Sequence, residues 1–330
     1  MLPVSTNAVI FFENAMVKPP KLTEGQKRKL KIFETKLRGA VYKGNYEHAK
    51  ELVFDIQNLL RPTGHETRLM KSKNWLFEAA LEAGELGIAE RGFQGILQKM
   101  NKSTRVYLEA SALLAIVYLR QGKITEAEPF MRAVLRNDKI IKSEKRNRQF
   151  RLNVIKRFEE EATIASFRNK FRERMSARNI QNEAGQLLQQ KTDEEIYEMI
   201  GKASPPETKQ LILKVSEFAK KQLPPADIKL LPSPRDRIND KNVGITVFQA
   251  SKNVLWRSLC DPKSDIYQAW VHKGIGFFFS KIYLGTAVIQ SLTNIGMGIK
   301  SLAVPLTALI IKFGIEIYCE KYKPQGVMLE

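Results

Sequence analysis

The sequence predicts an all-α protein: a solenoid of helical hairpins, a long basic helix that caps it, and an apolar helical hairpin at the C-terminal end. Two observations predict this class. Apolar residues recur every three or four positions over most of the chain, as in amphipathic helices. The 330 residues are 43% hydrophobic with only 14 Pro and 19 Gly, a composition that excludes disordered and collagen-like proteins and suffices for a substantial core.

Changes in composition divide the chain into four segments. We expect an N-terminal arm over 1–21, a helical-repeat domain with its basic capping helix over 22–185, a Pro-punctuated helical connection over 186–242 and an apolar helical domain over 243–330. The arm lacks the positive leading region and the cleavage site of a signal peptide. Within the last segment, residues 244–248 suit either a lone strand or the start of a helix, because five residues do not define a period.

Three segments of the first half share a turn glycine that is followed by a small residue on the next helix. The pairs are Gly44 with Ala49, Gly84 with Ala89, and Gly122 with Ala127. A glycine reverses the chain with positive φ, and a small residue lets two antiparallel helices approach closely. Over about residues 26–141 this pattern resembles the tetratricopeptide repeat family, whose unit is a helix-turn-helix of ~34 residues.

The resemblance implies a concave groove that holds a protein or peptide partner and performs no catalysis. Other helical-hairpin solenoids, or an unrelated helical bundle, are the alternatives.

The region 132–178 contains neither Gly nor Pro and carries fifteen Lys and Arg against six acidic residues. Its apolar spacing predicts one long helix, or two helices with a kink, that pack on the last repeat. Such a charge excess suits phosphates or an acidic partner. The candidate contacts are Lys142, Lys145, Arg146, Arg148, Arg151, Arg168, Lys170 and Arg172. The alternative is a solvated helix face with internal ion pairs, such as Glu160 or Glu161 with Arg157.

The last third of the chain is unusually apolar. Residues 282–299 carry no charge, and neither do residues 301–311. Two short membrane spans of a hairpin would fit these lengths, and the flanking Lys and Arg would leave both ends in the cytoplasm. The expected lipid contacts are Phe277, Phe278, Phe279, Leu284, Ile289, Leu306, Ile310 and Ile311. A buried helical hairpin of a soluble domain is the alternative.

Residues that carry chemistry are few. Two cysteines and three histidines provide neither a disulfide framework nor a four-cysteine zinc site, and they favour a reducing compartment. No nucleophile elbow, phosphate loop or zinc-protease motif occurs. We therefore expect no enzyme activity, no cofactor and no metal site.

These observations together predict a non-enzymatic adaptor or effector in the cytoplasm. Its repeat domain would bind a protein or peptide partner, and its apolar hairpin would anchor in or perturb an inner membrane with anionic lipids. Small residues in the C-terminal region would allow a homo-oligomer to form there. The net charge of +19 supports an alternative, a soluble basic scaffold that binds nucleic acid or an acidic protein.

Overall fold

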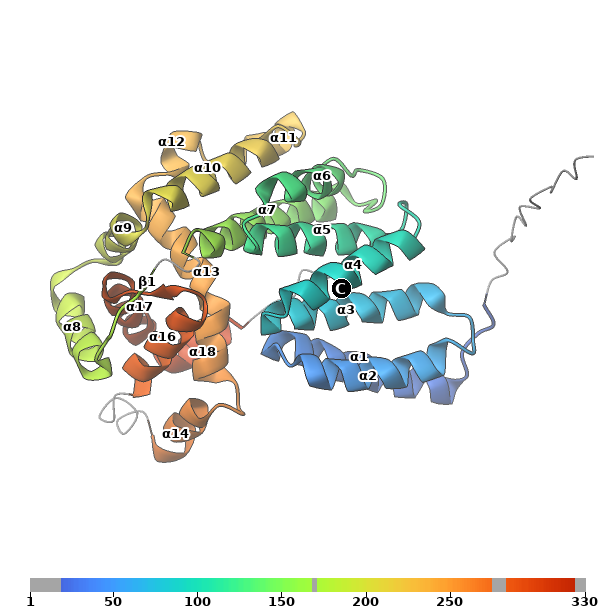
Figure 1. Cartoon of the computed structure of the whole chain (residues 1–330), viewed down its shortest axis with the longest axis horizontal. Helices are drawn as coiled ribbons and strands as arrows, with labels where there is room; N and C mark the ends of the chain where they lie inside the picture. Colours follow the sequence, from blue (N-terminus) through green and yellow to red (C-terminus); the bar gives the residue numbers. More distant parts are fainter. Residues whose placement is uncertain (1–18, 168–170, 275–282, 324–330) are drawn as a thin grey trace, which may run out of the picture.

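The computed structural model describes residues 19–167, 171–274 and 283–323, and this part of the chain is all-α (Figure 1). Three consecutive helix pairs come first: α1 (Glu24–Lys43) with α2 (Tyr46–Leu60), α3 (Glu66–Ala83) with α4 (Leu86–Lys99), and α5 (Arg105–Arg120) with α6 (Ile124–Leu135). They form one end of the molecule, at the lower right and centre of Figure 1.

Local sequence signals account for the boundaries of these pairs. Thr23 begins α1 with a capping box in which its side chain and that of Gln26 each accept a hydrogen bond from the other residue's backbone N–H. Gly44 ends α1 with φ of 60°, and Gly84 and Gly122 also have positive φ, as the sequence predicts. Glycine is favoured at position 44 for two reasons. Its φ is positive, and a Cβ added there would lie 3.0 Å from the Glu82 carbonyl oxygen.

The described residues after the three helix pairs form the rest of the elements. The elements are α7 (Glu144–Phe167), β1 (Phe171–Arg172), α8 (Ala177–Gln190), α9 (Asp193–Ala203), α10 (Pro206–Lys220), α11 (Pro225–Ile228), α12 (Pro234–Arg237), α13 (Asp240–Cys260), α14 (Asp265–Lys273), α16 (Tyr283–Asn294), β2 (Met297–Gly298), α17 (Lys300–Phe313) and α18 (Ile315–Lys321). In Figure 1, α10 to α12 run along the top, and the C-terminal helices gather at the left.

Two hydrophobic clusters hold the described chain together. The first contains the three helix pairs and most of α7, with α5 at its centre, where thirteen of sixteen residues are buried. The second begins at Phe167 and joins α8, α9, α13, α16, α17 and α18. The expected connection over 186–242 is thus shared between the clusters, since α9 packs on α13 and α10 packs on α7.

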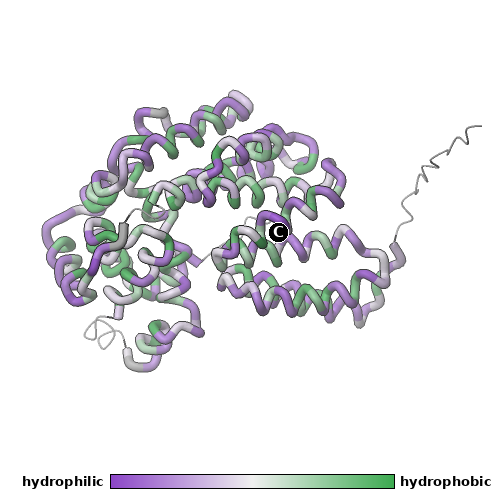
Figure 2. Tube along the Cα trace, in the orientation of Figure 1, coloured by the Kyte–Doolittle hydropathy of each residue, from purple (hydrophilic) through white to green (hydrophobic). Residues whose placement is uncertain are grey.

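The second cluster depends on a close helix crossing. A Cβ added at Gly201 in α9 would lie 1.8 Å from the Asp240 carbonyl oxygen, and one at Gly244 in α13 would lie 1.8 Å from that of Tyr197. Any side chain at either position would therefore collide with the backbone of the facing helix. Figure 2 shows hydrophobic residues concentrated along the C-terminal helices of this cluster.

The structure differs from the sequence predictions at two places. The basic segment is not one long helix, because a loop separates α6 from α7, and α7 ends at Phe167. A two-residue parallel pairing joins β1 to β2, with Phe171 opposite Met297. The open question over residues 244–248 is also answered, since they are helical within α13.

Candidate functional site

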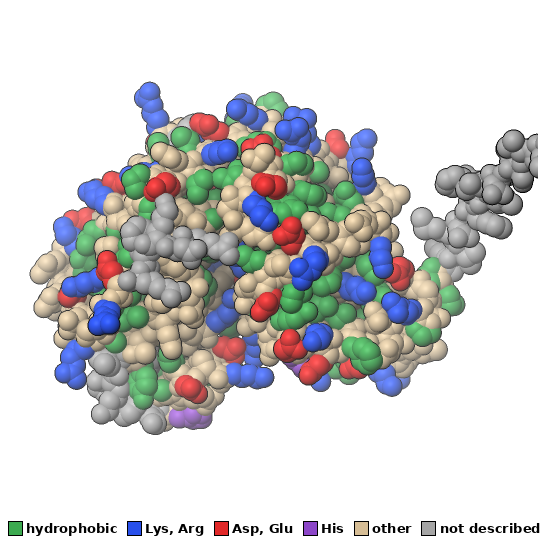
Figure 3. Space-filling model, viewed as in Figure 1, with side chains coloured by type: hydrophobic (Ala, Val, Ile, Leu, Met, Phe, Trp, Pro, Cys, Tyr) green, Lys and Arg blue, Asp and Glu red, His purple; other side chains and the backbone are tan. Residues whose placement is uncertain are grey.

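A groove of about 1470 Å³ lies between the first helix of each pair, α7, α13 and the end of α18. We call it the basic groove, because ten of its lining side chains are cationic and two are acidic. The cations are Arg38, Lys71, Arg105, Lys142, Arg146, Lys156, Arg157, Lys252, Lys321 and Lys323, and the acids are Glu78 and Glu160. On the face seen in Figure 3, by contrast, cationic and acidic side chains are interspersed.

Several groove cations have no acidic partner. Among the described residues, no carboxylate pairs with Arg38, Lys71, Lys142, Arg146, Lys156 or Lys323, whereas Lys252 lies 3.4 Å from Glu160 and Arg105 lies 3.1 Å from Glu109. Unmatched cations in a concave site focus a positive potential, which attracts acidic ligands.

An aromatic residue lies between two of these cations. The guanidinium carbon of Arg38 is 5.7 Å from the Trp75 ring centroid, and Lys71 Nζ is 4.9 Å from it. Trp75 itself is only 5% exposed. Its ring therefore positions the two cations through cation–π contacts and offers little surface to a ligand. The groove wall also contains apolar side chains, such as Ile140, Ile141 and Phe150.

A cluster of buried ion pairs joins the two halves of the molecule at the edge of this groove. Glu82, at the end of α3, pairs with Arg157 of α7 at 2.5 Å and with Arg257 of α13. Arg120 of α5 holds Glu161 through two hydrogen bonds of 2.5 and 2.6 Å, and Arg157 lies 2.8 Å from the same carboxylate. We call these five residues the Glu82 cluster.

Two of the arginines also bind the end of α3 directly. Arg120 Nη1 donates to the Leu81 carbonyl oxygen at 2.6 Å, and Arg257 Nη1 donates to that of Glu82 at 2.8 Å. The last carbonyl groups of a helix lack partners within it and carry its negative dipole end. Cations from α5 and α13 therefore add to the backbone cap of α3, in which the Gly84 N–H also donates to the Leu81 carbonyl oxygen at 3.1 Å.

Burial and charge shift the pKa values at this junction in opposite directions. Burial alone would raise the pKa of Glu82, but the guanidiniums of Arg157, Arg257 and Arg120 outweigh it and hold that pKa well below its usual range. Burial raises the pKa of Glu160 and lowers that of Lys252, which neighbour one another. Glu82 is thus a firmly ionised group, whereas Glu160 retains its charge less readily.

The residues predicted to contact phosphates or an acidic partner lie in different environments in the structure. Lys142, Lys145 and Arg146 are exposed, and Lys142 and Arg146 line the basic groove. Arg148 and Arg151 instead pair with the buried Asp227 of α11 at 2.8 and 2.5 Å. Arg168 and Lys170 lie outside the described residues, as does the side chain of Arg172.

Asp227 gives an acid-dependent contribution to stability. Burial would raise its pKa, but the hydrogen bonds from Arg148 and Arg151 lower it below the ordinary value of 3.8. A carboxyl whose pKa is lower in the folded than in the unfolded protein contributes fully to stability above its unfolded-state pKa. It loses this contribution as pH falls through its folded-state pKa.

Asp227→Asn is expected to lower the free energy of unfolding at pH 6 and to differ much less from the unmodified protein near pH 2. Urea denaturation at both pH values measures this, and a constant difference would contradict it.

The predicted repeat-packing residues lie at the helix turns and crossings. Gly44, Gly84 and Gly122 end the first helix of each pair or its turn, and Ala49, Ala89 and Ala127 are fully buried on the second helices. The alternative prediction was a solvated helix face with internal ion pairs. Of these, the ion pairs occur, since Arg157 pairs with Glu161 and lies 4.0 Å from Glu160, but all three side chains are largely buried and not solvated.

The predicted lipid-contacting residues occupy several environments. Leu284, Leu306 and Ile310 are buried in the second cluster, and Ile289 and Ile311 pack against it. Phe277, Phe278 and Phe279 lie outside the described residues. In the described part of the chain, no single helix is long and apolar enough to span a membrane, although α17 and α18 reach the threshold together with a 93° bend between them.

The two cysteines form a disulfide. Cys260 at the end of α13 is bonded to Cys319 of α18, 59 positions later. The sequence-based argument excluded a framework of several disulfides and favoured a reducing compartment, and it did not predict this single bond. Spacing alone did not reveal the pair, because the approach of α18 to α13 is tertiary. Among the described residues, no group of three or more His, Cys, Asp or Glu side chains could hold a metal.

Sequence reasoning missed the Glu82 cluster and the groove residues on α1 and α3. A weak signal existed for the groove, since Arg38 and Lys71 lie on the first helices of two predicted repeats. For the cluster, the sequence indicated only the local pair of Arg157 with Glu161, because the other partners are up to 175 positions apart. No protein-family model, no curated protein and no solved structure matches this chain.

Proposed function

We propose that this protein is a non-enzymatic binding protein that holds an acidic polypeptide segment in its basic groove. The observation that carries the proposal is the group of six groove cations without a carboxylate partner among the described residues. In this proposal the three helix pairs act as a tetratricopeptide-like solenoid, with α7 as a cap and the C-terminal helices closing one end of the groove.

The chemistry of the groove favours an acidic peptide over nucleic acid. Single-stranded nucleic acid needs aromatic faces on which its bases stack, whereas Trp75 is buried between Arg38 and Lys71. The half-buried wall residues Ile140 and Ile141 suit the side chains of a peptide. Arg and Lys at the rim would pair with its carboxylates.

Reversal of charge at two groove cations should weaken peptide binding. Lys142→Glu/Arg146→Glu is expected to weaken a fluorescein-labelled Glu/Leu peptide by about tenfold or more, since two attractive contacts become repulsive. Fluorescence anisotropy at two salt concentrations measures the affinity and its screening.

Arg28→Glu/Lys31→Glu is the matched control. It changes the net charge equally, but on exposed residues of α1 that do not line the groove. An equal loss in both variants would attribute binding to net charge and contradict the groove. Tighter binding of an oligothymidylate than of the peptide would contradict the acidic-peptide proposal and indicate that the groove binds nucleic acid.

Membrane association through α17 and α18 is a second candidate function. It is supported by the apolar bent pair and by Ile317 of α18, which is 60% exposed. We expect the protein to float with vesicles that contain phosphatidylglycerol, and Ile317→Glu to reduce this recovery because it places a charge on the apolar surface. Phe54→Glu, at a 63% exposed position on α2, is the control. Recovery of all unmodified protein in the soluble fraction would contradict the proposal.

A further inference from the structure

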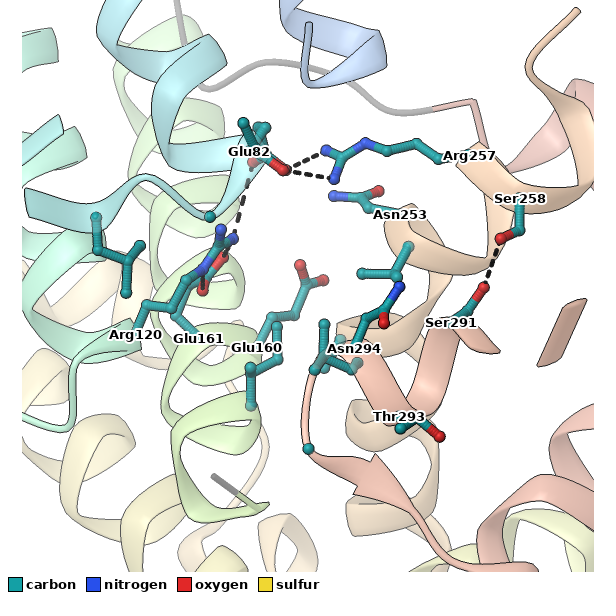
Figure 4. A pocket seen from close by; sticks show the side chains of 18 of the residues that line it. Glu82, Arg120, Glu160, Glu161, Asn253, Arg257, Ser258, Ser291, Thr293 and Asn294 are labelled. Atoms are coloured by element: carbon teal, nitrogen blue, oxygen red, sulfur yellow. Dashed lines mark hydrogen bonds and ion pairs between the residues drawn. The ribbon is translucent and has the colours of Figure 1, made fainter. Parts of the chain in front are cut away.

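A second cavity, of about 990 Å³, lies where the two hydrophobic clusters meet (Figure 4). We call it the junction cavity. Its walls come from residues within 82–86, 157–164, 250–258 and 291–296, together with Arg120 and Ser264. Its volume is that of a site for a small organic ligand.

The charged side chains of this cavity already neutralise one another. Arg120, Arg157 and Arg257 are bound by Glu82 and Glu161, as the dashed lines of Figure 4 partly show. All three arginines already pair with a carboxylate, so a phosphate or carboxylate ligand would have to compete for them, although Arg157 Nε is a buried donor without a hydrogen-bond partner. The net charge of +19 and three nearby guanidiniums also disfavour a cationic ligand. The walls therefore suit a neutral molecule.

One buried oxygen acceptor in the cavity lacks a donor, and a second accepts only a long hydrogen bond. Asn253 is 8% exposed, and its Oδ1 is buried without a hydrogen-bond partner. Glu160 is 5% exposed. Its Oε1 lies 3.4 Å from Lys252, and its Oε2 has no closer cation than Arg157 at 4.0 Å among the described residues. Figure 4 shows both end groups facing the same open space. A buried acceptor without a donor is costly.

The rest of the wall completes the recognition chemistry. Ser258 and Ser291 from facing helices share a hydrogen bond of 2.8 Å, so each hydroxyl keeps capacity for a ligand hydroxyl. Leu86, Ile164 and Val254 supply aliphatic surface for a flat ring. Adjacent N–H donors of a heterocycle match a carboxylate with a neighbouring amide oxygen.

We propose that the junction cavity binds a neutral nucleoside whose base presents adjacent N–H donors to Glu160 and Asn253. Arg157, Glu160 and Asn253 line both this cavity and the basic groove, but the rest of the cavity wall is its own. The ligand also differs in size and charge from the partner of the groove, so this site is a separate binding activity. Guanosine is the appropriate probe, because its N1–H and 2-amino group form such a donor edge. Inosine is the matched analogue, because it lacks only the 2-amino group.

Isothermal titration calorimetry on the full chain tests the proposal. Guanosine is expected to bind saturably, and about tenfold or more tighter than inosine, because inosine leaves one buried acceptor unpaired. Asn253→Leu should reduce guanosine affinity to the level of inosine, whereas Asn58→Leu, at an exposed position on α2, should leave it unchanged.

Four outcomes would contradict the proposed nucleoside site. They are the absence of saturable guanosine binding, equal binding of inosine, unchanged affinity in Asn253→Leu, and tighter binding of guanosine monophosphate than of guanosine. Should Asn253→Leu fail to fold, the comparison of guanosine with inosine on the unmodified protein decides alone.

Discussion

Replacement of Glu82 by leucine is expected to lower the free energy of unfolding by about 3 to 5 kcal/mol, because removal of one member leaves buried ionic partners uncompensated. Arg157 lies 2.5 Å from this carboxylate and Arg257 pairs with it, while Arg120 lies 3.9 Å away. Glu161 is the other acid of the Glu82 cluster and already binds two of these arginines. The substitution thus leaves three guanidiniums to one carboxylate.

Urea denaturation followed by circular dichroism measures this loss. Glu320→Leu, at an exposed position on α18, is the control, and we expect it to change the free energy of unfolding by less than about 0.5 kcal/mol. A loss below about 1 kcal/mol for Glu82→Leu would mean that solvent screens the cluster as it screens surface ion pairs.

Removal of the disulfide is expected to have an effect of similar size. Cys260→Ser/Cys319→Ser should lower the free energy of unfolding by about 4 kcal/mol, the chain-entropy value for a closed loop of about sixty residues. The bond also keeps α18 against α13, where Trp256 Nε1 donates to the Cys319 carbonyl oxygen at 2.7 Å and Tyr318 is fully buried.

Denaturation with and without dithiothreitol checks this prediction. Reductant should destabilise the unmodified protein to the level of the double variant and leave the double variant itself unchanged. Two free thiols in the unmodified protein under non-reducing conditions, found by alkylation and mass spectrometry, would contradict the bond.

The two binding sites share residues, although their proposed ligands differ. Arg157, Glu160 and Asn253 line both the basic groove and the junction cavity. Both sites therefore lie at the meeting of the two clusters and not within either one. A site at such a boundary requires both halves to be folded and in contact.

Local chemistry made part of this structure predictable from sequence. Helical periodicity indicates the all-α class, since it depends only on residues three and four positions apart. Positive φ at Gly44 was predictable for a similar reason, because a helix that reverses needs the left-handed conformation at its end. The prediction of one long helix, or of two helices with a kink, over 132–178 was wrong, because α7 covers only Glu144–Phe167 and β1 follows it. Absence of Gly and Pro permits a helix but does not require one.

The sequence by itself determined the helical class, the turns of the first three helix pairs and the excess of positive charge. Only the tertiary structure decided which charges are free and which are buried in pairs: Arg151 is held by Asp227, whereas Lys142 and Arg146 line a groove. Tertiary structure also paired Cys260 with Cys319 and brought Gly201 against α13. The physical reason is range, because helix signals act within one turn, whereas ion pairs, helix crossings and disulfides join residues that only the folded chain brings together.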